Sequence, residues 1–303
     1  MKQEVIERKG PGHPDTICDT LAEVLGKNLK ALYKSHYGEC KHYNVDKVLA
    51  SCGEVNYKKG VMTKPVKIVF SGNATKVEGL NELLRNVVDK VLQKEINNGF
   101  KYKIYNHISL CSPDLTSNFN KRKANDTSFS VGSPLTQNEK LVLKIGKYIE
   151  KLSTENPFVG TDYKIMFVNG KITIALAMIS GDFDNNYTYQ QCKMAVKDAV
   201  EKKFKINIKL NTADNREQCF NTITGTSLEQ GDAGMVGRGN RYNGLITPMQ
   251  PMTMEAYCGK NDVTHIGKIY QKRAFELAQK TKKRILMVND IGESINKPKI
   301  IKW

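Results

Sequence analysis

The chain of 303 residues has no apolar run long enough to span a membrane. A transmembrane helix needs about 20 predominantly apolar residues, and a secretion signal needs a shorter apolar core near its start. The first ten residues, MKQEVIERKG, contain no such core. We therefore expect a cytoplasmic protein without a membrane partner, and the 40% of hydrophobic residues is enough for a folded interior.

Ordered cysteine motifs are also missing, because the seven cysteines are scattered and never spaced as CxxC or beside histidines at zinc-ligand intervals. An odd, scattered set favours free thiols in a reducing compartment over a disulfide framework. The GxxxxGK[ST] spacing of a phosphate-binding loop is absent too, since Asn261 follows Gly259 and Lys260. These absences argue against a zinc module, a disulfide scaffold and a P-loop kinase.

Acidic residues are scarce relative to basic ones, 31 against 47, which gives a net charge of +16 at pH 7. Basic chains often bind nucleic acid, but such proteins usually cluster their cations and interleave them with aromatic residues. Here the lysines are spread through apparent helices, as in 27–34 and 193–203. We expect a mostly solvated surface that steers a polyanionic small molecule toward a cleft. Nucleic acid is not the partner we expect, and salt-sensitive binding to DNA or RNA would be its signature.

Helical and extended patterns alternate along the chain, which is typical of an α/β protein. Apolar residues at helical spacing predict helices over 14–35, 80–92, 136–149, 187–204 and 262–281. β-rich runs predict strands over 48–50, 66–70, 101–110, 163–168, 171–178, 205–211 and 284–289. Asn169-Gly170 between two of these runs is a strong hairpin signal, and Thr136 with Glu139 forms a capping box. The order predicts repeated units of α+β type with mostly antiparallel sheets.

The segment ERKGPGHPDTICD at residues 7–19 joins a loop to the first helix. Its glycines let backbone amides approach an anion, its second proline suits the first helical position, and a helix N-terminus favours negative charge. His13 and Asp15 would then lie at the mouth of a site for a polyphosphate and its metal. An ordinary helix start, with Asp15 or Thr16 as the cap and Asp19 complementing the dipole, explains the segment equally well.

Two further segments combine glycine with cations. In 231–241 glycines alternate with a carboxylate and two arginines, whose guanidiniums make forked hydrogen bonds to phosphate, although a flexible solvent loop is the alternative. In 259–268 a Gly-Lys pair opens a helix, and Lys260, His265 and Lys268 could present positive charge to one anion. The polar stretch 117–127 is typical of a surface connection, with a lid as the alternative.

Six motifs occur in one order along nearly the whole chain: ERKGPGHPDTICD, ANDTSFSVG, DYK at 162–164, LNTAD, GTSLEQGDAGMVGRGNRYNGLITP and MEAYCGKNDVTHIGKIY. Together they resemble S-adenosylmethionine synthetase of the archaeal type. The resemblance implies three similar α/β units around a pseudo-threefold axis, and a homodimer with its active sites between the subunits. The expected units are 1–100, 101–226 with a lid-like loop, and a shortened third unit over 227–303.

The resemblance also implies a reaction. The sulfur of methionine attacks the ribose C5′ of ATP, the triphosphate leaves, and the enzyme hydrolyses it to pyrophosphate and phosphate, with Mg²⁺ and in some members K⁺ as cofactors. A thioether is nucleophilic without losing a proton, so the first step needs no general base. It needs alignment of the two reacting atoms and cations around the departing triphosphate.

The resemblance assigns roles to individual positions in four groups. Catalytic contacts to the triphosphate are implied for His13, Lys164, Arg238, Lys260 and His265. Other contacts to ATP are implied for Asp126, Asp162 and Lys268. Contacts to methionine are implied for Glu54 and Asp232, and ligation of Mg²⁺ for Asp15. The structural alternatives are a strand-edge pair for Asp162 with Lys164 and an Asx turn at Asp126.

Several positions depart from the family pattern. Residues 109–112, SLCS, replace a glycine-glutamine-glycine-serine lid, Ala233 replaces an aspartate, and Asp262 replaces a proline. The expected third unit also stops early, at Trp303. These departures leave two alternatives to a normal synthetase: a non-catalytic or regulatory paralogue, and a variant that uses a methionine analogue.

Overall fold

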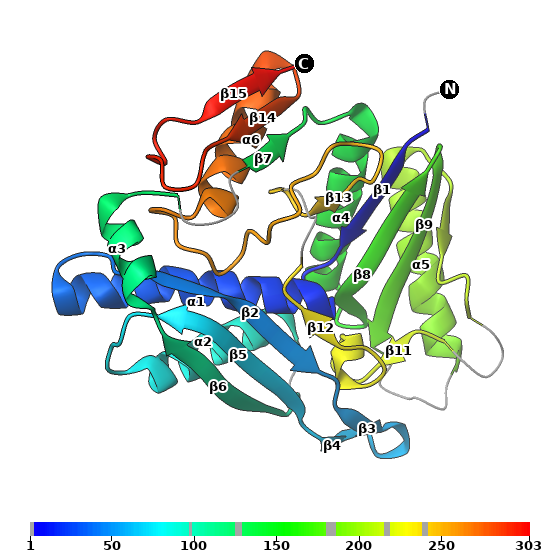
Figure 1. Cartoon of the computed structure of the whole chain (residues 1–303). Helices are drawn as coiled ribbons and strands as arrows, with labels where there is room; N and C mark the ends of the chain where they lie inside the picture. The colour runs from blue at the N-terminus through cyan, green and yellow to red at the C-terminus, as the bar shows by residue number, and fades with distance from the viewer. Residues whose placement is uncertain (1–2, 97–98, 125–128, 180–185, 215–218, 238–241) are drawn as a thin grey trace.

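The computed structural model describes residues 3–96, 99–124, 129–179, 186–214, 219–237 and 242–303. Figure 1 shows three main sheets, with the long helix α1 (Pro14–Tyr37) crossing the middle of the molecule. Antiparallel pairings predominate, and the parallel pairings are β5 with β6, β9 with β10 and β9 with β11. The expected α/β class with mostly antiparallel sheets is confirmed.

The first sheet has the strand order β12-β2-β5-β6, from Gly234–Met235, Tyr43–Ser51, Val66–Ala74 and Tyr102–Leu110. Helix α1 and helix α2 (Leu80–Glu95) cover one of its faces. Leu21, Leu25 and Leu29 of α1 recur every four residues and are fully buried in this core. The helix ends where Gly38, with φ of 73°, donates its N–H to Lys34. A small hairpin of β3 (Glu54–Asn56) and β4 (Val61–Lys64) with the short helix η1 (Tyr57–Lys59) extends from this sheet.

The second sheet has the order β10-β9-β8-β1-β13, with β11 also paired to β9. Its strands are Ile208–Leu210, Lys171–Ile179, Val159–Val168, Val5–Lys9, Leu245–Ile246 and Asn221–Thr222. Helices α4 (Gln137–Glu155) and α5 (Asn186–Phe204) pack on one face. The predicted hairpin is confirmed, because β8 and β9 pair around Asn169-Gly170, whose φ angles are both positive. The capping box of Thr136 and Glu139 is confirmed as well.

The third sheet has the order β15-β14-β7, from Lys299–Lys302, Ile285–Val288 and Phe129–Gly132. Helix α6 (Ile266–Thr281) packs against it through its own apolar cluster. Gly132 allows this close packing, since a Cβ atom there would lie 2.2 Å from the carbonyl oxygen of Ala274. No helix within the described part of the chain has the length and apolar character to cross a bilayer.

Three local predictions need correction. Helix α3 (Pro113–Lys121) occupies part of the stretch expected to be a loop at 117–127. Helix α6 begins at Ile266 and not at 262, because the Asn261 side chain accepts the N–H groups of Val263 and Thr264 and holds a turn there. The strand expected over 205–211 is limited to β10, after Lys205 adopts a positive φ of 54°.

The sheets take strands from distant parts of the chain. Strand β1 belongs to the second sheet, β12 to the first, and β7 to the third. Strands β6 and β12 belong to the first sheet, although they lie beyond the boundaries expected at residues 100 and 226. We therefore propose three structural units that are defined by their sheets and built from interleaved segments.

Candidate active site

His13 caps the first helix beside the second sheet. It has an extended backbone, with φ of −66° and ψ of 137°, and its side chain accepts the N–H of Asp15 at Nδ1, 3.2 Å away. The alternative named Asp15 or Thr16 as the cap, and that capping residue is wrong, whereas Pro14 does take the first helical position. A neutral imidazole that accepts at Nδ1 carries its proton on Nε2. His13 therefore has Nε2–H available as a donor.

The electrostatic surroundings keep this imidazole neutral. Burial, together with the charges of Lys9 and Lys164, lowers the pKa of His13 to about 4, against the opposing effects of Asp15 and Asp232. Only 7% of the residue is exposed. Near neutral pH, His13 can thus donate a hydrogen bond to an anion without carrying a positive charge.

The glycines of the first loop serve packing and not the expected approach to an anion. The N–H groups of Gly10 and Gly12 donate to the carbonyls of Tyr163 and Thr161 in β8, at 2.6 and 3.1 Å. A Cβ atom on Gly12 would lie 2.3 Å from the Thr161 side chain. These contacts use the two amides and bring the loop close to β8, where further predicted residues lie.

Two lysines meet across strands β1 and β8. Lys9 and Lys164 are direct partners in the antiparallel register, so their side chains lie on the same face of the sheet. The ammonium of Lys9 is 2.6 Å from Asp15 Oδ2, and Lys164 Nζ is 3.8 Å from Glu7 Oε1. This face carries exposed side chains such as Met166, whereas helices α4 and α5 pack on the other face.

The carboxylate of Asp15 is held by two donors. Lys9 contacts one oxygen, and the N–H of Met235 donates to the other at 3.1 Å. Burial by itself raises the pKa of Asp15, but these hydrogen bonds and the charge of Lys9 outweigh it, so the pKa lies below its ordinary value. Asp15 is therefore a preformed carboxylate that already has a cation beside it.

Asp162 is buried close to Lys164. Its Oδ2 accepts the N–H of Ser227 at 2.8 Å and the Ser227 hydroxyl at 2.6 Å, while the neighbouring Thr226 hydroxyl donates to the carbonyl of Gly12 at 2.7 Å. Burial raises the pKa of Asp162 to about 6 despite the two bonds from Ser227. The short helix η2 (Ser227–Glu229) thus holds Asp162 and the His13 loop together.

Asp232 completes this group from an exposed position. Its charge raises the pKa of both His13 and Asp162, and its Oδ1 accepts the N–H of Ala233 at 2.9 Å. Five of the predicted residues therefore come together. We call His13, Asp15, Asp162, Lys164 and Asp232, together with Lys9, the first cluster.

Lys260 and His265 belong to a different, buried group. Lys260 is 1% exposed, and its ammonium lies 3.0 Å from Asp46 Oδ2 and also contacts Glu255. The ring of His265 is 3.5 Å from Lys260 Nζ, and burial lowers the pKa of His265 well below its ordinary range. Lys268 is ion-paired to Glu23 and lies over the ring of Tyr257. The described contacts do not join these three residues to the first cluster.

The remaining predicted residues lie elsewhere. Glu54 is an exposed residue on the β3–β4 hairpin, 2.5 Å from Lys64. Asp126 and Arg238 lie outside the described residues. At residues 109–112, where the family resemblance implies a lid, Leu110 is 70% exposed and the thiol of Cys111 is 3.1 Å from His42 Nδ1.

Sequence reasoning missed an acidic face on α1. Asp15, Asp19 and Glu23 are spaced by four residues and therefore share one side of the helix. They accept the N–H groups of Met235 at 3.1 Å, Gly237 at 2.8 Å and Gly259 at 3.4 Å. This face fixes two glycine-containing segments beside the site, and the regular spacing of the acids was the signal that could have revealed it.

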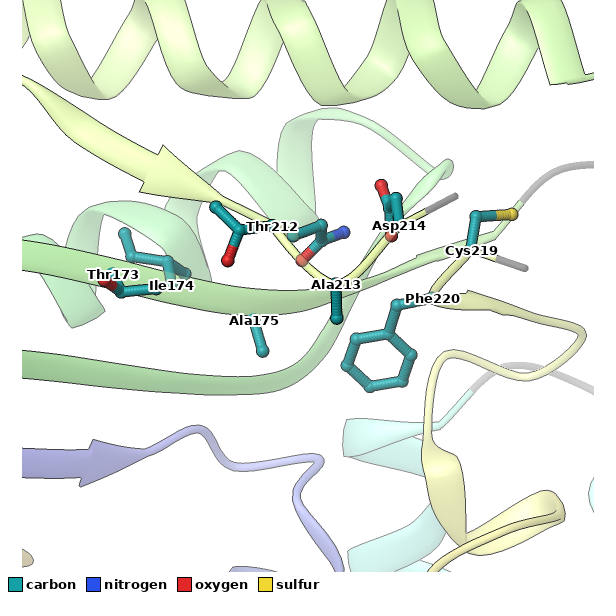
Figure 2. A pocket seen from close by; sticks show the side chains of 9 residues that line it. Thr173, Ile174, Ala175, Thr212, Ala213, Asp214, Cys219 and Phe220 are labelled. Carbon is teal, nitrogen blue, oxygen red and sulfur yellow. The ribbon is translucent and has the colours of Figure 1, made fainter. Parts of the chain in front are cut away.

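A pocket of about 340 Å³ lies on the second sheet. Residues of β9, the LNTAD segment and the segment before β11 line it, among them Ala175, Ala213 and Phe220. Figure 2 shows the Phe220 ring and the side chains of Ala213 and Ala175 directed into a common space. Because Ala175 is the register partner of Lys164, this largely apolar pocket is next to the first cluster.

The first cluster fits a magnesium site completed by a substrate. Among the described residues, no group of three or more His, Cys, Asp and Glu side chains could hold a metal ion. Mg²⁺ often uses only one or two carboxylates together with substrate phosphates. Asp15 would supply such a carboxylate, and its Oδ2 lies 2.6 Å from the ammonium of Lys9.

Comparisons with known proteins identify the family of this chain. The family model described as S-adenosylmethionine synthetase (AdoMet synthetase) matches residues 1–303. The chain is 40% identical to the probable S-adenosylmethionine synthase of Aquifex aeolicus, covering 98% of this chain and 84% of that protein. It is 38% identical to the S-adenosylmethionine synthase of Pyrococcus furiosus, covering 97% and 83%.

The fold is also similar to that of a solved structure. An unusual S-adenosylmethionine synthetase from Campylobacter jejuni superposes with a TM-score of 0.66 at 14% identity, over 99% of this chain and 80% of that one. At that identity the structure supports the fold, while the family model and the curated relatives support the family. The chain belongs to the S-adenosylmethionine synthetase family.

Proposed function

We propose that this protein makes S-adenosylmethionine from ATP and methionine at the first cluster. The observation that carries the proposal is the arrangement of Lys164, a neutral His13 with a free Nε2–H, and the Asp15 carboxylate around one exposed sheet face. This combination suits a reaction whose main requirement is stabilisation of a departing polyanion.

Each residue has a role in the proposed reaction. The thioether sulfur forms a bond to C5′ of ATP while the bond from C5′ to the triphosphate oxygen breaks, and the electron pair leaves with the triphosphate. Lys164 and His13 donate to oxygens of the leaving group. Asp15 would hold Mg²⁺, which would supply positive charge that neutralises part of the triphosphate charge. K⁺ remains a prediction from the family resemblance.

The substrates also need positions around the leaving group. The pocket beside Lys164 has an apolar lining and a volume, about 340 Å³, suited to the nucleoside part of ATP. We assign Asp162 to the ribose side and Asp232 to the methionine ammonium. Glu54 stays a candidate for methionine, and Asp126 and Arg238 stay candidates for the nucleoside and the triphosphate.

Lys260, His265 and Lys268 have a different role in this proposal. Lys260 is buried between Asp46 and Glu255, and Lys268 is paired with Glu23, so both ammonium groups are already compensated. We assign these residues to holding the segment 259–268 against α1 and β2, in place of direct contacts to phosphate.

A product assay tests the function. Purified protein with ATP, methionine and Mg²⁺ should yield S-adenosylmethionine by mass spectrometry, together with pyrophosphate and phosphate. Because His13 and Asp15 act on the leaving group, His13→Ala and Asp15→Asn should each lower kcat by about 100-fold or more. His36→Ala and Asp290→Asn, at exposed positions, are the matched controls. Unchanged rates in both site variants would contradict the assignment.

A further inference from the structure

Lys9 has no assigned role, yet it occupies a central position in the first cluster. It is the last residue of β1, immediately before the Gly10 turn, and 22% of its side chain is exposed. Its ammonium is 2.6 Å from Asp15 Oδ2, and its charge lowers the pKa of His13. Lys9 therefore already contacts the residue that we expect to bind the metal.

Lys9 also faces a like charge. In the antiparallel register it lies directly opposite Lys164, and like charges in such cross-strand pairs are destabilising. Glu7 Oε1 is 3.9 Å from Lys9 Nζ and 3.8 Å from Lys164 Nζ, so the two ammonium groups lie near a common point. Glu7 and Asp15 together compensate the two ammonium groups in the nucleotide-free protein. If a metal engaged Asp15, Glu7 alone would face both, and the pair could then accept a further anion.

A divalent cation bound to Asp15 Oδ2 would repel the ammonium of Lys9, because both cations would lie beside one carboxylate oxygen. The other oxygen accepts the N–H of Met235 at 3.1 Å. Metal binding at Asp15 would therefore favour a new position for the ammonium. Lysine has a flexible four-carbon stem and an ammonium that can donate in several directions, so the displaced group can reach a neighbouring acceptor without backbone movement.

We propose that Lys9 neutralises Asp15 in the nucleotide-free protein and becomes a direct ligand of the triphosphate when the metal–nucleotide complex binds. The ammonium exchanges one oxyanion partner for another, and no covalent bond changes. This inference rests on the proposed function, because it requires a metal-bound triphosphate at the first cluster. A purely structural ion pair with Asp15 is the competing explanation.

Two binding measurements without turnover separate these explanations. In Lys9→Met, Mn²⁺ measured by electron paramagnetic resonance should bind the nucleotide-free protein several-fold more tightly, because no ammonium competes for Asp15. Inorganic tripolyphosphate with Mg²⁺, measured by calorimetry, should bind about 10- to 100-fold more weakly, because one charged hydrogen bond is lost. The two affinities thus shift in opposite directions.

Matched variants complete the test. Lys9→Arg keeps the charge and should leave both affinities near the wild-type values, and Lys299→Met removes an exposed lysine paired with Asp290 and should change neither. A loss of both affinities in Lys9→Met, or no change in either, overturns the proposal, as does wild-type protein that binds neither probe. Failure of the wild type to make S-adenosylmethionine counts separately, against the proposed function.

Discussion

Asp162 shows how a site residue can reduce the stability of the fold. Its carboxyl group has a pKa of about 6 in the folded protein against an ordinary 3.8, because burial disfavours the charged form. The unfolded chain therefore releases this proton at lower pH than the folded chain. The resulting loss of stability is absent below about pH 4, grows as the pH rises to about 6, and stays constant above that.

We predict that Asp162→Asn stabilises the protein at pH 8 by about 1–3 kcal/mol, since roughly two pKa units correspond to about 3 kcal/mol and the new amide nitrogen offsets part of the gain. An Asn oxygen can still accept from Ser227. Urea unfolding at pH 8 and near pH 4 measures the effect, and the gain should shrink at the lower pH. If Asp162→Asn lowered the free energy of unfolding equally at both pH values, burial of the charged Asp162 carboxylate would not be destabilising.

The roles of individual residues could be predicted from the sequence only where the residue belonged to a recognisable motif. His13 and Asp15 were predicted from the segment 7–19 and Lys164 from the family resemblance, and the structure brings the three together. Lys9 was missed because a single lysine in a chain with 47 basic residues carries no distinguishing pattern. Its role depends on the pairing of β1 with β8 and on the bond to Asp15, and neither is encoded in local spacing.

At the scale of the element, α1 connects the first cluster to the glycine-rich segment. We predict that Asp19→Ala loosens the segment 234–237, because it removes the acceptor for the Gly237 N–H. Loss of a hydrogen bond to a charged group costs about 1.5–3 kcal/mol, and displacement of nearby site residues should lower kcat about tenfold. Unfolding free energy and steady-state kinetics measure the two effects.

Two further variants serve as controls for the Asp19→Ala prediction. Asp19→Asn keeps an oxygen acceptor at the same position and should recover most of the kcat, which loss of helix stability alone would not explain. Glu155→Gln alters an exposed acid at the end of another helix and should have little effect. Wild-type kinetics in Asp19→Ala would mean that the acidic face does not position the segment.

Elements were predictable where local signals were strong. The alternating runs around Asn169-Gly170 and the Thr136 capping box specified a hairpin and a helix start that the structure confirms. Helix α3 was missed because residues 117–121 are mostly polar, although Ser112 followed by Pro113 was a usable start signal. The two-residue strands β11, β12 and β13 exist only through partners far away in the chain, so no local pattern could indicate them.

At the scale of the whole molecule, the first sheet exposes an apolar row on the face opposite α1 and α2. The register pairs Met235 with Leu49, Leu49 with Val69, and Val69 with Tyr105, so the row crosses all four strands. Leu49, Met235 and Tyr105 are 47%, 60% and 39% exposed. Contiguous exposed apolar surface of this kind often marks a protein interface. We propose that a second copy of the chain covers it, as the family resemblance implies.

We predict a dimer in sedimentation velocity, and at least about a 100-fold weaker dimer for Leu49→Lys, because a charge at the centre of the row would be buried without a partner. If the active site lies between subunits, S-adenosylmethionine production should fall together with the dimer fraction and recover at high protein concentration. Val61→Lys alters an equally exposed apolar residue on the β3–β4 hairpin, outside the row, and is the control. A Leu49→Lys protein that stays dimeric would place the subunit contact on another face.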